Sequence, residues 1–216
     1  MPDPPSAPGS LDLAVLDEFL LQNLPSGTLG QVRLIQPGDD RWLSYDEAFA
    51  LRNAIARVRN ASGAARYVAR QLCTQLGVAS PEIPRLPDGA PLWPASLVGS
   101  LAHDTAVAVA VVAMHTAVRG IGVDIEPSEP VEEPVACIVA TPAERFAFKN
   151  DFAGDKAIFC IKEAVFKAVY PQDGIWLEFS DVRILPARHA AETKYGRTVE
   201  WRVLTFPRTL AIAWWC

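Results

Sequence analysis

The longest uninterrupted apolar segment of the chain, residues 106–114, sets the strictest limit on its fold. A transmembrane helix needs about 20 apolar residues, so this segment is far too short to cross a bilayer. Valine and alanine fill nearly the whole segment, which is typical of a strand buried on both faces. We therefore expect residues 107–114 to form an inner strand of a sheet.

Apolar spacing elsewhere predicts a mixture of helices and strands. We expect helices over residues 11–24, 45–59, 63–76 and 156–169, and a further helix opening after Thr141. We expect the other strands over residues 31–36, 98–101, 121–125, 182–185, 199–206 and 210–215. Ser44 with Glu47 and Thr141 with Glu144 have the spacing of capping boxes, which mark helix starts. Two successive groups of helices and strands fit an α+β fold.

The chain has 216 residues, enough for one large domain or two small ones. Four prolines within residues 1–10 predict an extended lead-in, because proline fixes φ and removes an amide donor. Arg119 and Gly120 follow the apolar strand as a turn or boundary. We therefore divide the chain into the lead-in 1–10, an N-terminal half 11–118 and a C-terminal half 119–216.

Composition excludes several classes of protein. Half of the residues are apolar and 21% are charged, so the chain is expected to be globular. The net charge of −5 gives no reason to bind nucleic acid or an anionic membrane. The N-terminus lacks the features of a secretory signal, so we expect a cytoplasmic protein. The four cysteines lie too far apart to predict a zinc site or a disulfide framework.

Charge is unevenly distributed along the chain. Residues 41–85 contain seven basic and three acidic side chains, whereas residues 121–155 contain eight acidic and two basic ones. An anion suits the first region and a metal cation suits the second.

Residues 120–126 alternate between apolar residues and small or acidic ones, as a strand does. This period of two places Asp124 and Glu126 on the same face. Two neighbouring carboxylates repel each other unless a cation lies between them, and their oxygens suit Mg²⁺ or Mn²⁺ better than zinc. For this motif taken alone, a solvent-exposed strand face is the more common explanation.

The segment 159–171 concentrates charge on an apolar helix. Glu163 and Lys167 lie one helical turn apart, and Lys162 lies about 100° around the helix from Glu163. An exposed ion pair is the ordinary explanation of such spacing. Because the helix is otherwise apolar, its charges are expected to be buried and to need partners such as a metal or a phosphate.

Residues 93–104 contain groups that suit a phosphate. Gly99 permits close approach of the backbone, Ser100 supplies a hydroxyl and His103 supplies a donor. A lone histidine is more often structural than functional. The segment also lacks the second glycine of a Gly-x-Ser-x-Gly motif, which disfavours a serine hydrolase.

In their order along the chain, these segments resemble the 4′-phosphopantetheinyl transferases of the type that activates surfactin and enterobactin synthetases. The matching pieces are Arg66 with Leu72, Arg85 with Gly89 and Pro91, Gly99 to His103, Gly122 to Glu126, and Lys162 to Ala168. The resemblance covers residues 85–171 well and 46–76 moderately. It implies the fold of that family, a monomer with a pseudo-twofold pair of α+β halves and coenzyme A in the cleft between them.

The resemblance implies transfer of the 4′-phosphopantetheine group of coenzyme A to a serine of an apo acyl or peptidyl carrier protein, with release of adenosine 3′,5′-bisphosphate. It implies that Asp124, Glu126 and Glu163 hold Mg²⁺, for which Mn²⁺ can substitute. Glu163 is the expected base, and Lys167 is expected to steady the transferred phosphoryl group. The implied contacts to coenzyme A are Arg66, Arg85, Ser100, His103 and Lys162.

Two residues depart from the family pattern. Ala65 precedes Arg66 where many relatives have glycine, and Asp104 follows His103 where a cysteine or a small residue is common. An acid beside a phosphate site weakens binding unless it points away or pairs with an arginine. The family branch further implies a pathway of nonribosomal peptide, siderophore or polyketide synthesis.

Two alternatives stay open at this point. A catalytically weak relative would bind coenzyme A or a carrier domain without efficient transfer. Another Mg²⁺-dependent enzyme, such as a phosphohydrolase, would use the same carboxylates and release phosphate without a carrier. The intact acidic residues and Lys167 argue against the first, and the ordered motifs outside the metal site argue against the second.

Overall fold

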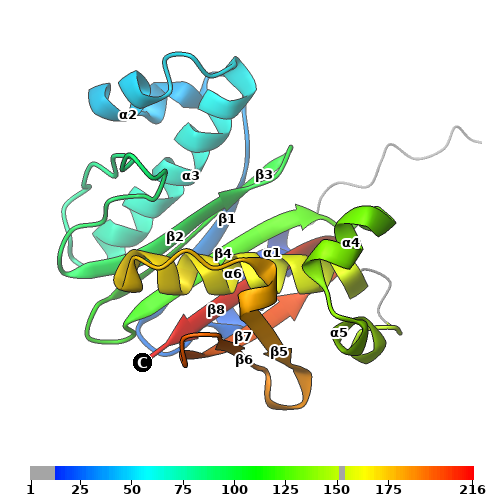
Figure 1. Cartoon of the computed structure of the whole chain (residues 1–216). Helices are drawn as coiled ribbons and strands as arrows, with labels where there is room; N and C mark the ends of the chain where they lie inside the picture. The colour runs from blue at the N-terminus through cyan, green and yellow to red at the C-terminus, as the bar shows by residue number, and fades with distance from the viewer. Residues whose placement is uncertain (1–12, 151–153) are drawn as a thin grey trace, which may run out of the picture.

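Two antiparallel sheets form the centre of the protein in a computed structural model that describes residues 13–150 and 154–216. The first sheet has the order β1-β3-β2, with β1 Thr28–Leu34, β2 Leu97–His103 and β3 Val107–Met114. The second has the order β4-β8-β7-β6-β5, with β4 Gly120–Pro127, β5 Val182–Leu185, β6 Ala190–Thr193, β7 Thr198–Leu204 and β8 Arg208–Trp215. Figure 1 shows both sheets running through the middle of the molecule.

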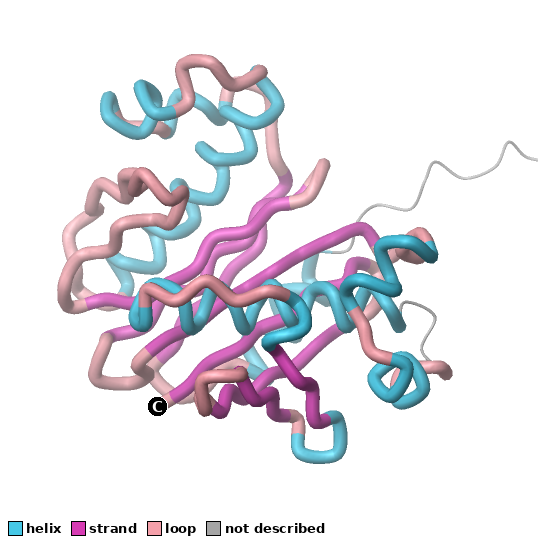
Figure 2. The backbone as a smooth tube through the Cα atoms, viewed as in Figure 1, coloured by secondary structure: helices cyan, strands magenta, loops and turns pink. Residues whose placement is uncertain are grey.

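Helices cover the sheets from several sides, as Figure 2 shows. The α-helices are α1 Leu13–Asn23, α2 Tyr45–Ala50, α3 Ala56–Gln75, α4 Glu133–Val139, α5 Pro142–Ala147 and α6 Gly154–Asp173. Short 3-10 helices lie at Asp39–Trp42 (η1), Phe179–Asp181 (η2) and Pro186–Arg188 (η3). Helix α3 packs on the first sheet and α6 packs on β4 and β8 of the second. The predicted α+β architecture is confirmed.

Strand β3 is buried on both faces, as its valine and alanine run predicts. Val107, Val109 and Val111 enter a core that also contains residues of β4, β8 and α1. Ala110 and Val112 point the other way and pack against α3. The first sheet is therefore covered by α3 on one side and by the second sheet and α1 on the other.

The helix predicted over residues 45–59 is interrupted. Helix α2 ends at Ala50, and α3 begins only at Ala56 and continues through Gly63 to Gln75. Gly63 lies inside the helix because η1 packs directly on it: a Cβ there would come within 2.1 Å of the Asp39 carbonyl oxygen. The glycine therefore marks a close contact between segments and not a helix start.

Local signals elsewhere match the structure closely. Both capping boxes form. The side chains of Ser44 and Thr141 accept hydrogen bonds from the amides of Glu47 and Glu144, and the side chain of each glutamate accepts a hydrogen bond from the amide of the capping residue. Strand β6 and helix α4 are missing from the predictions, whereas β5, which is as short as β6, was predicted with its bounds. The predicted lead-in 1–10, and the start of the helix expected from residue 11, lie outside the described residues.

Two further expectations concern cysteines and membranes. Cys73 and Cys160 are buried, Cys137 and Cys216 are exposed, and each of the four is a free thiol. In the described parts of the chain, we find no helix long and apolar enough to cross a bilayer.

Candidate active site in the cleft between the sheets

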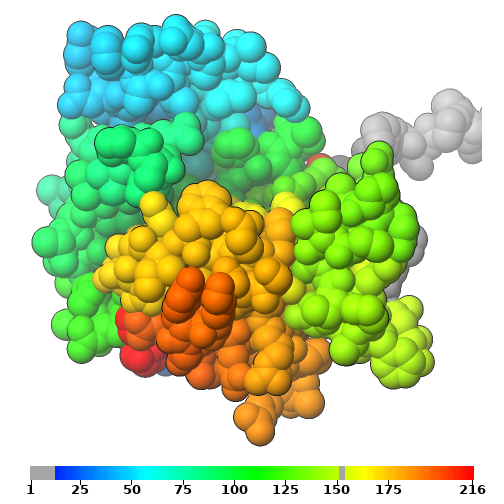
Figure 3. Space-filling model, viewed as in Figure 1, coloured from blue at the N-terminus to red at the C-terminus, as the bar shows by residue number. Residues whose placement is uncertain are grey.

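A cavity of about 250 Å³ lies between the first sheet and helix α6. Its wall includes Arg85, Gly99 and Ser100 from the N-terminal half, and Phe166 and Lys167 from α6. In Figure 3 the surface of α6, in yellow, adjoins the green surface of the segment that precedes β2. The cavity brings together three residues that the sequence analysis assigned to one site, Arg85, Ser100 and Lys167.

Two glycines let α6 lie very close to β4. A Cβ on Gly122 would lie 1.9 Å from the carbonyl oxygen of Ala164, and one on Gly120 would lie 2.1 Å from that of Ala168. No other residue type fits at such distances, since real Cβ contacts are longer. The small residues of this strand thus bring its acidic face up to the helix that carries Glu163 and Lys167.

Asp124 and Lys167 form the central pair of the site. The Lys167 ammonium lies 2.6 Å from Oδ1 of Asp124 and also donates to the Val123 carbonyl oxygen at 3.3 Å. Burial lowers the pKa of Lys167, but the neighbouring Asp124 outweighs this and the pKa is raised overall, so the lysine stays charged. Asp124 is itself buried, with its Oδ2 lacking a hydrogen-bond partner among the residues that the structure describes.

Burial changes the pKa values of the two remaining carboxylates more than the neighbouring charges do. Burial raises the pKa of Glu126, and Asp124 raises it further. Burial also raises the pKa of Glu163, where Lys167 opposes the shift and Asp124 adds to it. Both carboxylates are therefore harder to ionise than a carboxylate in water, and a bound cation would favour their charged forms.

These residues fit a divalent cation that is held only partly by protein. Asp124 offers an unpartnered buried oxygen, and the donors are carboxylates, which suit Mg²⁺ or Mn²⁺. Within residues 13–150 and 154–216, however, no group of three acidic, histidine or cysteine side chains is placed so that it could hold a metal ion, so Asp124, Glu126 and Glu163 are not brought together as one ligand set. Mg²⁺ is commonly bound by one or two carboxylates, and water and substrate phosphates complete its coordination shell. An open site is therefore consistent with the usual coordination of Mg²⁺.

A cluster of arginines lies around the buried Glu47 of α2. The Glu47 carboxylate accepts hydrogen bonds from the Arg70 guanidinium, at 2.5 Å, and from the Ile83 amide. It also lies 3.7 Å from Nε of Arg66. Burial lowers the pKa of Arg66; Glu47 opposes this, and Arg70 and Arg85 add to it. Three arginines with one carboxylate leave surplus positive charge, which suits an anion such as a phosphate. Of the three, Arg85 lines the cavity, whereas Arg66 is buried and donates to Ser62 and to the Ile83 carbonyl oxygen.

The sequence analysis missed Glu47 and Arg70 as part of this cluster. Arg70 lies one turn after Arg66 on α3, so helical spacing could have indicated it. Glu47 had no such signal, because it was already explained as a capping residue. Its carboxylate performs both roles, since Oε2 also accepts the Ser44 amide at 2.9 Å.

His103 lies at the end of β2 with its side chain exposed. Desolvation by the surrounding protein lowers its pKa, and the positive charge of Lys167 contributes to the shift. Asp104, the next residue, opposes this shift through a backbone hydrogen bond to the imidazole. A neutral imidazole there can donate one hydrogen bond to an oxyanion.

Ser100 links the two halves directly. Its Oγ accepts the Val123 amide at 3.1 Å, and the residue is only 3% exposed. Ser100→Ala leaves that buried amide unpaired, so we expect the free energy of unfolding to fall by about 1–3 kcal/mol. Urea titration measures this loss, and a variant as stable as the parent would show that the bond contributes nothing.

The structure departs from the prediction at Lys162, which it does not bring to the cleft. The ammonium is 2% exposed and lies 3.0 Å from both Oε2 of Glu144 and the carbonyl oxygen of Phe179. The charge does find partners, as an apolar helix requires, but they are a buried glutamate and a backbone carbonyl. Lys162 therefore ties α5 and η2 to α6, and we no longer assign it to coenzyme A.

Lys162→Met tests this structural role. It leaves the carboxylate of Glu144 buried without its cation, so we expect a loss of about 3–5 kcal/mol in the free energy of unfolding. At a temperature where the variant is still folded, its affinity for coenzyme A should equal that of the parent. A stable variant with weakened affinity would return Lys162 to the binding site.

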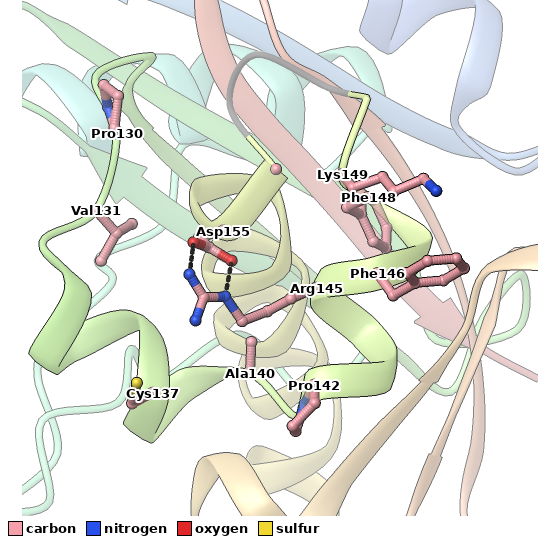
Figure 4. A pocket seen from close by; sticks show the side chains of 11 residues that line it. Pro130, Val131, Cys137, Ala140, Pro142, Arg145, Phe146, Phe148, Lys149 and Asp155 are labelled. Atoms are coloured by element: carbon pink, nitrogen blue, oxygen red, sulfur yellow. Dashed lines mark hydrogen bonds and ion pairs between the residues drawn. The ribbon is translucent and has the colours of Figure 1, made fainter.

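A second cavity, of about 810 Å³, lies under α4 and α5 at the start of α6 (Figure 4). There Arg145 pairs with Asp155 of α6 and with Glu133 of α4. Phe146, on the rim, is 68% exposed. None of the residues predicted for the active site lines this cavity, so it is a separate feature of the C-terminal half.

Comparison with known proteins adds an independent finding. Residues 46–113 match the 4′-phosphopantetheinyl transferase N-terminal domain, and residues 120–214 match the 4′-phosphopantetheinyl transferase superfamily. These two matches cover the elements that carry Glu47, Arg66 and Ser100 and those that carry Asp124 and Lys167.

Three curated proteins are similar over most of their length. The chain is 36% identical to the 4′-phosphopantetheinyl transferase PptT of Mycobacterium tuberculosis over 64% of this chain and 63% of that protein. It is 34% identical to the transferase Npt of Nocardia iowensis over 74% and 73% of the two chains. It is 32% identical to the transferase Svp of Streptomyces mobaraensis over 74% and 69%. The match thus spans just under two thirds of the mycobacterial protein and somewhat more of the other two.

Proposed function

The chain belongs to the 4′-phosphopantetheinyl transferase superfamily, and from this premise we propose that it transfers the 4′-phosphopantetheine group of coenzyme A to a serine of apo carrier proteins. The second product is adenosine 3′,5′-bisphosphate. The observation that carries the proposal is the ion pair of the buried Asp124 and the partly exposed Lys167, which faces a cleft whose other wall holds Ser100 and Arg85.

Coenzyme A would lie along this cleft with its nucleotide towards the arginines. Arg66 and Arg85, with Arg70 beside them, supply the positive charge that a 3′-phosphate needs. His103 and Lys167 would lie nearer the reacting pyrophosphate. The basic half would thus bind the nucleotide of coenzyme A, and the acidic half would bind the region of its pyrophosphate.

Asp124, Glu126 and Glu163 are the residues that would hold Mg²⁺, although the structure does not close them into one cage. When bound, Mg²⁺ neutralises charge on the pyrophosphate and lowers the barrier to its displacement. Lys167 would hold the transferred phosphoryl group by its ammonium, which Asp124 keeps charged and orients.

Glu163 is the group that would remove the proton from the incoming serine. Its raised pKa reflects a carboxylate in a partly desolvated site, where it is a stronger base than in water. The serine oxygen forms a bond to the β-phosphorus as the bond from that phosphorus to the bridging oxygen breaks. The electron pair leaves with adenosine 3′,5′-bisphosphate, and the proton passes to Glu163.

Three finer points extend this proposal. A single chain supplies both walls of the cleft, which supports action as a monomer. Halves at 11–118 and 119–216 would then bind coenzyme A and the metal, respectively. The carriers would belong to nonribosomal peptide, siderophore or polyketide synthesis, as the family branch implies, and the cytoplasmic location stays a prediction.

Product analysis tests the reaction class. The protein is incubated with coenzyme A and Mg²⁺, with and without an apo carrier protein, and adenosine 3′,5′-bisphosphate is measured by chromatography. The proposal requires release of the bisphosphate only when the carrier is present. Equal release without a carrier, or release of inorganic phosphate, would favour a phosphohydrolase and contradict the proposal.

A further inference from the structure

Asp104, one of the two residues that depart from the family pattern, is folded into the turn between β2 and β3. Its Oδ1 accepts the amides of Ala106 and Val107 at 2.6 and 2.7 Å, and its own amide donates to the Val107 carbonyl oxygen. The side chain is 1% exposed. The carboxylate therefore fixes the turn that begins immediately after His103.

The other oxygen of this carboxylate reaches across to the second sheet. Oδ2 of Asp104 lies 3.2 Å from Nε of Arg208, whose side chain is 15% exposed; the two atoms are close enough for an ion pair, but neither makes a hydrogen bond among the described residues. Arg208 is the first residue of β8 and pairs in register with Pro127 of β4, one residue beyond Glu126. The ion pair thus joins the turn after His103 to the end of the strand that carries Asp124 and Glu126.

Burial makes this pair depend on both partners. A buried charge without its counter-ion is energetically unfavourable. If either residue is replaced, the charged side chain that remains is expected to move. The turn and the strand end lie in different halves of the chain. Asp104 also contributes to the raised pKa of Glu126, which agrees with their proximity.

We propose that Asp104 is a positioning residue for coenzyme A: through Arg208 it holds the β2–β3 turn, and with it His103, against the metal-binding strand. This inference rests on the proposed function. It meets the exception stated for an acid at this position, which does not weaken phosphate binding when it pairs with an arginine.

The two explanations predict opposite changes in affinity. Asp104→Asn keeps an oxygen that can accept the two turn amides but removes the charge that pairs with Arg208. If Asp104 positions the site, the Kd of coenzyme A measured by calorimetry should rise about tenfold, and Arg208→Gln should have a similar effect. If Asp104 only repels phosphates, Asp104→Asn should bind coenzyme A more tightly, which would overturn the proposal.

A double variant shows whether the residues act together. Asp104→Asn with Arg208→Gln should raise the Kd no more than the worse single change, because the pair can be broken only once. Effects that multiply would contradict an action through the pair. The kinetic counterpart is a raised KM for coenzyme A with kcat nearly unchanged, which a general loss of stability does not produce.

Asp173→Asn is the matched control. Asp173 pairs with Arg197 at 2.5 Å within the C-terminal half alone, so its loss should leave the Kd of coenzyme A unchanged. If the parent protein itself binds no coenzyme A, the proposed function fails. If the parent binds but Asp104→Asn and Arg208→Gln bind equally well, only the positioning role of Asp104 is overturned.

Discussion

Asp124→Asn is expected to lower kcat for carrier modification by about a thousandfold, because charge stabilisation by a metal is worth several kcal/mol and each 1.4 kcal/mol is about tenfold. The amide keeps the size of the carboxylate but loses its charge. It removes the oxygen that has no protein partner and also the counter-ion of Lys167. The variant should therefore lose both the metal and the orientation of the lysine.

Initial rates with a saturating apo carrier measure this effect, and circular dichroism establishes that the variant is folded. Asp173→Asn, outside the cleft, is the control and should keep the parental kcat. Raising Mg²⁺ should recover only a small part of the activity, since the position of Lys167 is not restored. Near-normal turnover of Asp124→Asn would contradict the assignment of Asp124 to the centre of the reaction.

Glu163→Gln is expected to reduce kcat by roughly a hundred- to ten-thousandfold, the usual contribution of a general base. The substitution preserves shape and hydrogen-bonding length on α6, so coenzyme A should bind with its parental Kd. The loss should therefore appear in kcat and not in the KM for coenzyme A. Single-turnover experiments with a preformed complex measure the chemical step directly.

Glu192→Gln provides the matched change of glutamate to glutamine on the exposed side of the second sheet, where Glu192 pairs with Arg183. It should leave both kcat and KM unchanged. If Glu163→Gln retained turnover close to that of this control, Glu163 would be neither base nor metal ligand. The proton of the serine would then have to leave by a route other than this carboxylate.

Local patterns predicted the parts of the fold that depend on neighbours in sequence. The valine-rich run gave the bounds of β3 because burial on both faces leaves a continuous apolar signal. The capping boxes are equally local, since donor and acceptor lie three residues apart. The same is true of the alternation that places Asp124 and Glu126 on one face of β4.

Long-range packing explains what the patterns could not show. Gly120 was interpreted as a boundary and Gly63 as a helix start, but both mark places where another backbone lies against the glycine. That contact involves residues distant in sequence, so no local signal reports it. Helix α3, which follows the break after α2, packs against η1 in the same way.

The charged residues of α6 show most clearly what the sequence alone cannot predict. Their buried setting correctly indicated that Lys162 and Lys167 need partners, and the helical angle between them was also available from the sequence. Only the structure identifies the partners: Asp124 for Lys167 and Glu144 for Lys162. A helix packed on several sides can place one lysine in a cleft and the next in the protein interior.

Intact mass of a carrier protein tests the central claim most directly. An apo carrier is incubated with coenzyme A, Mg²⁺ and the protein, beside reactions containing EDTA and a carrier whose acceptor serine is replaced by alanine. The account predicts that the mass of the carrier increases by one phosphopantetheine group, only with metal and only when the serine is present. An unchanged mass on carriers that another phosphopantetheinyl transferase does modify would contradict it.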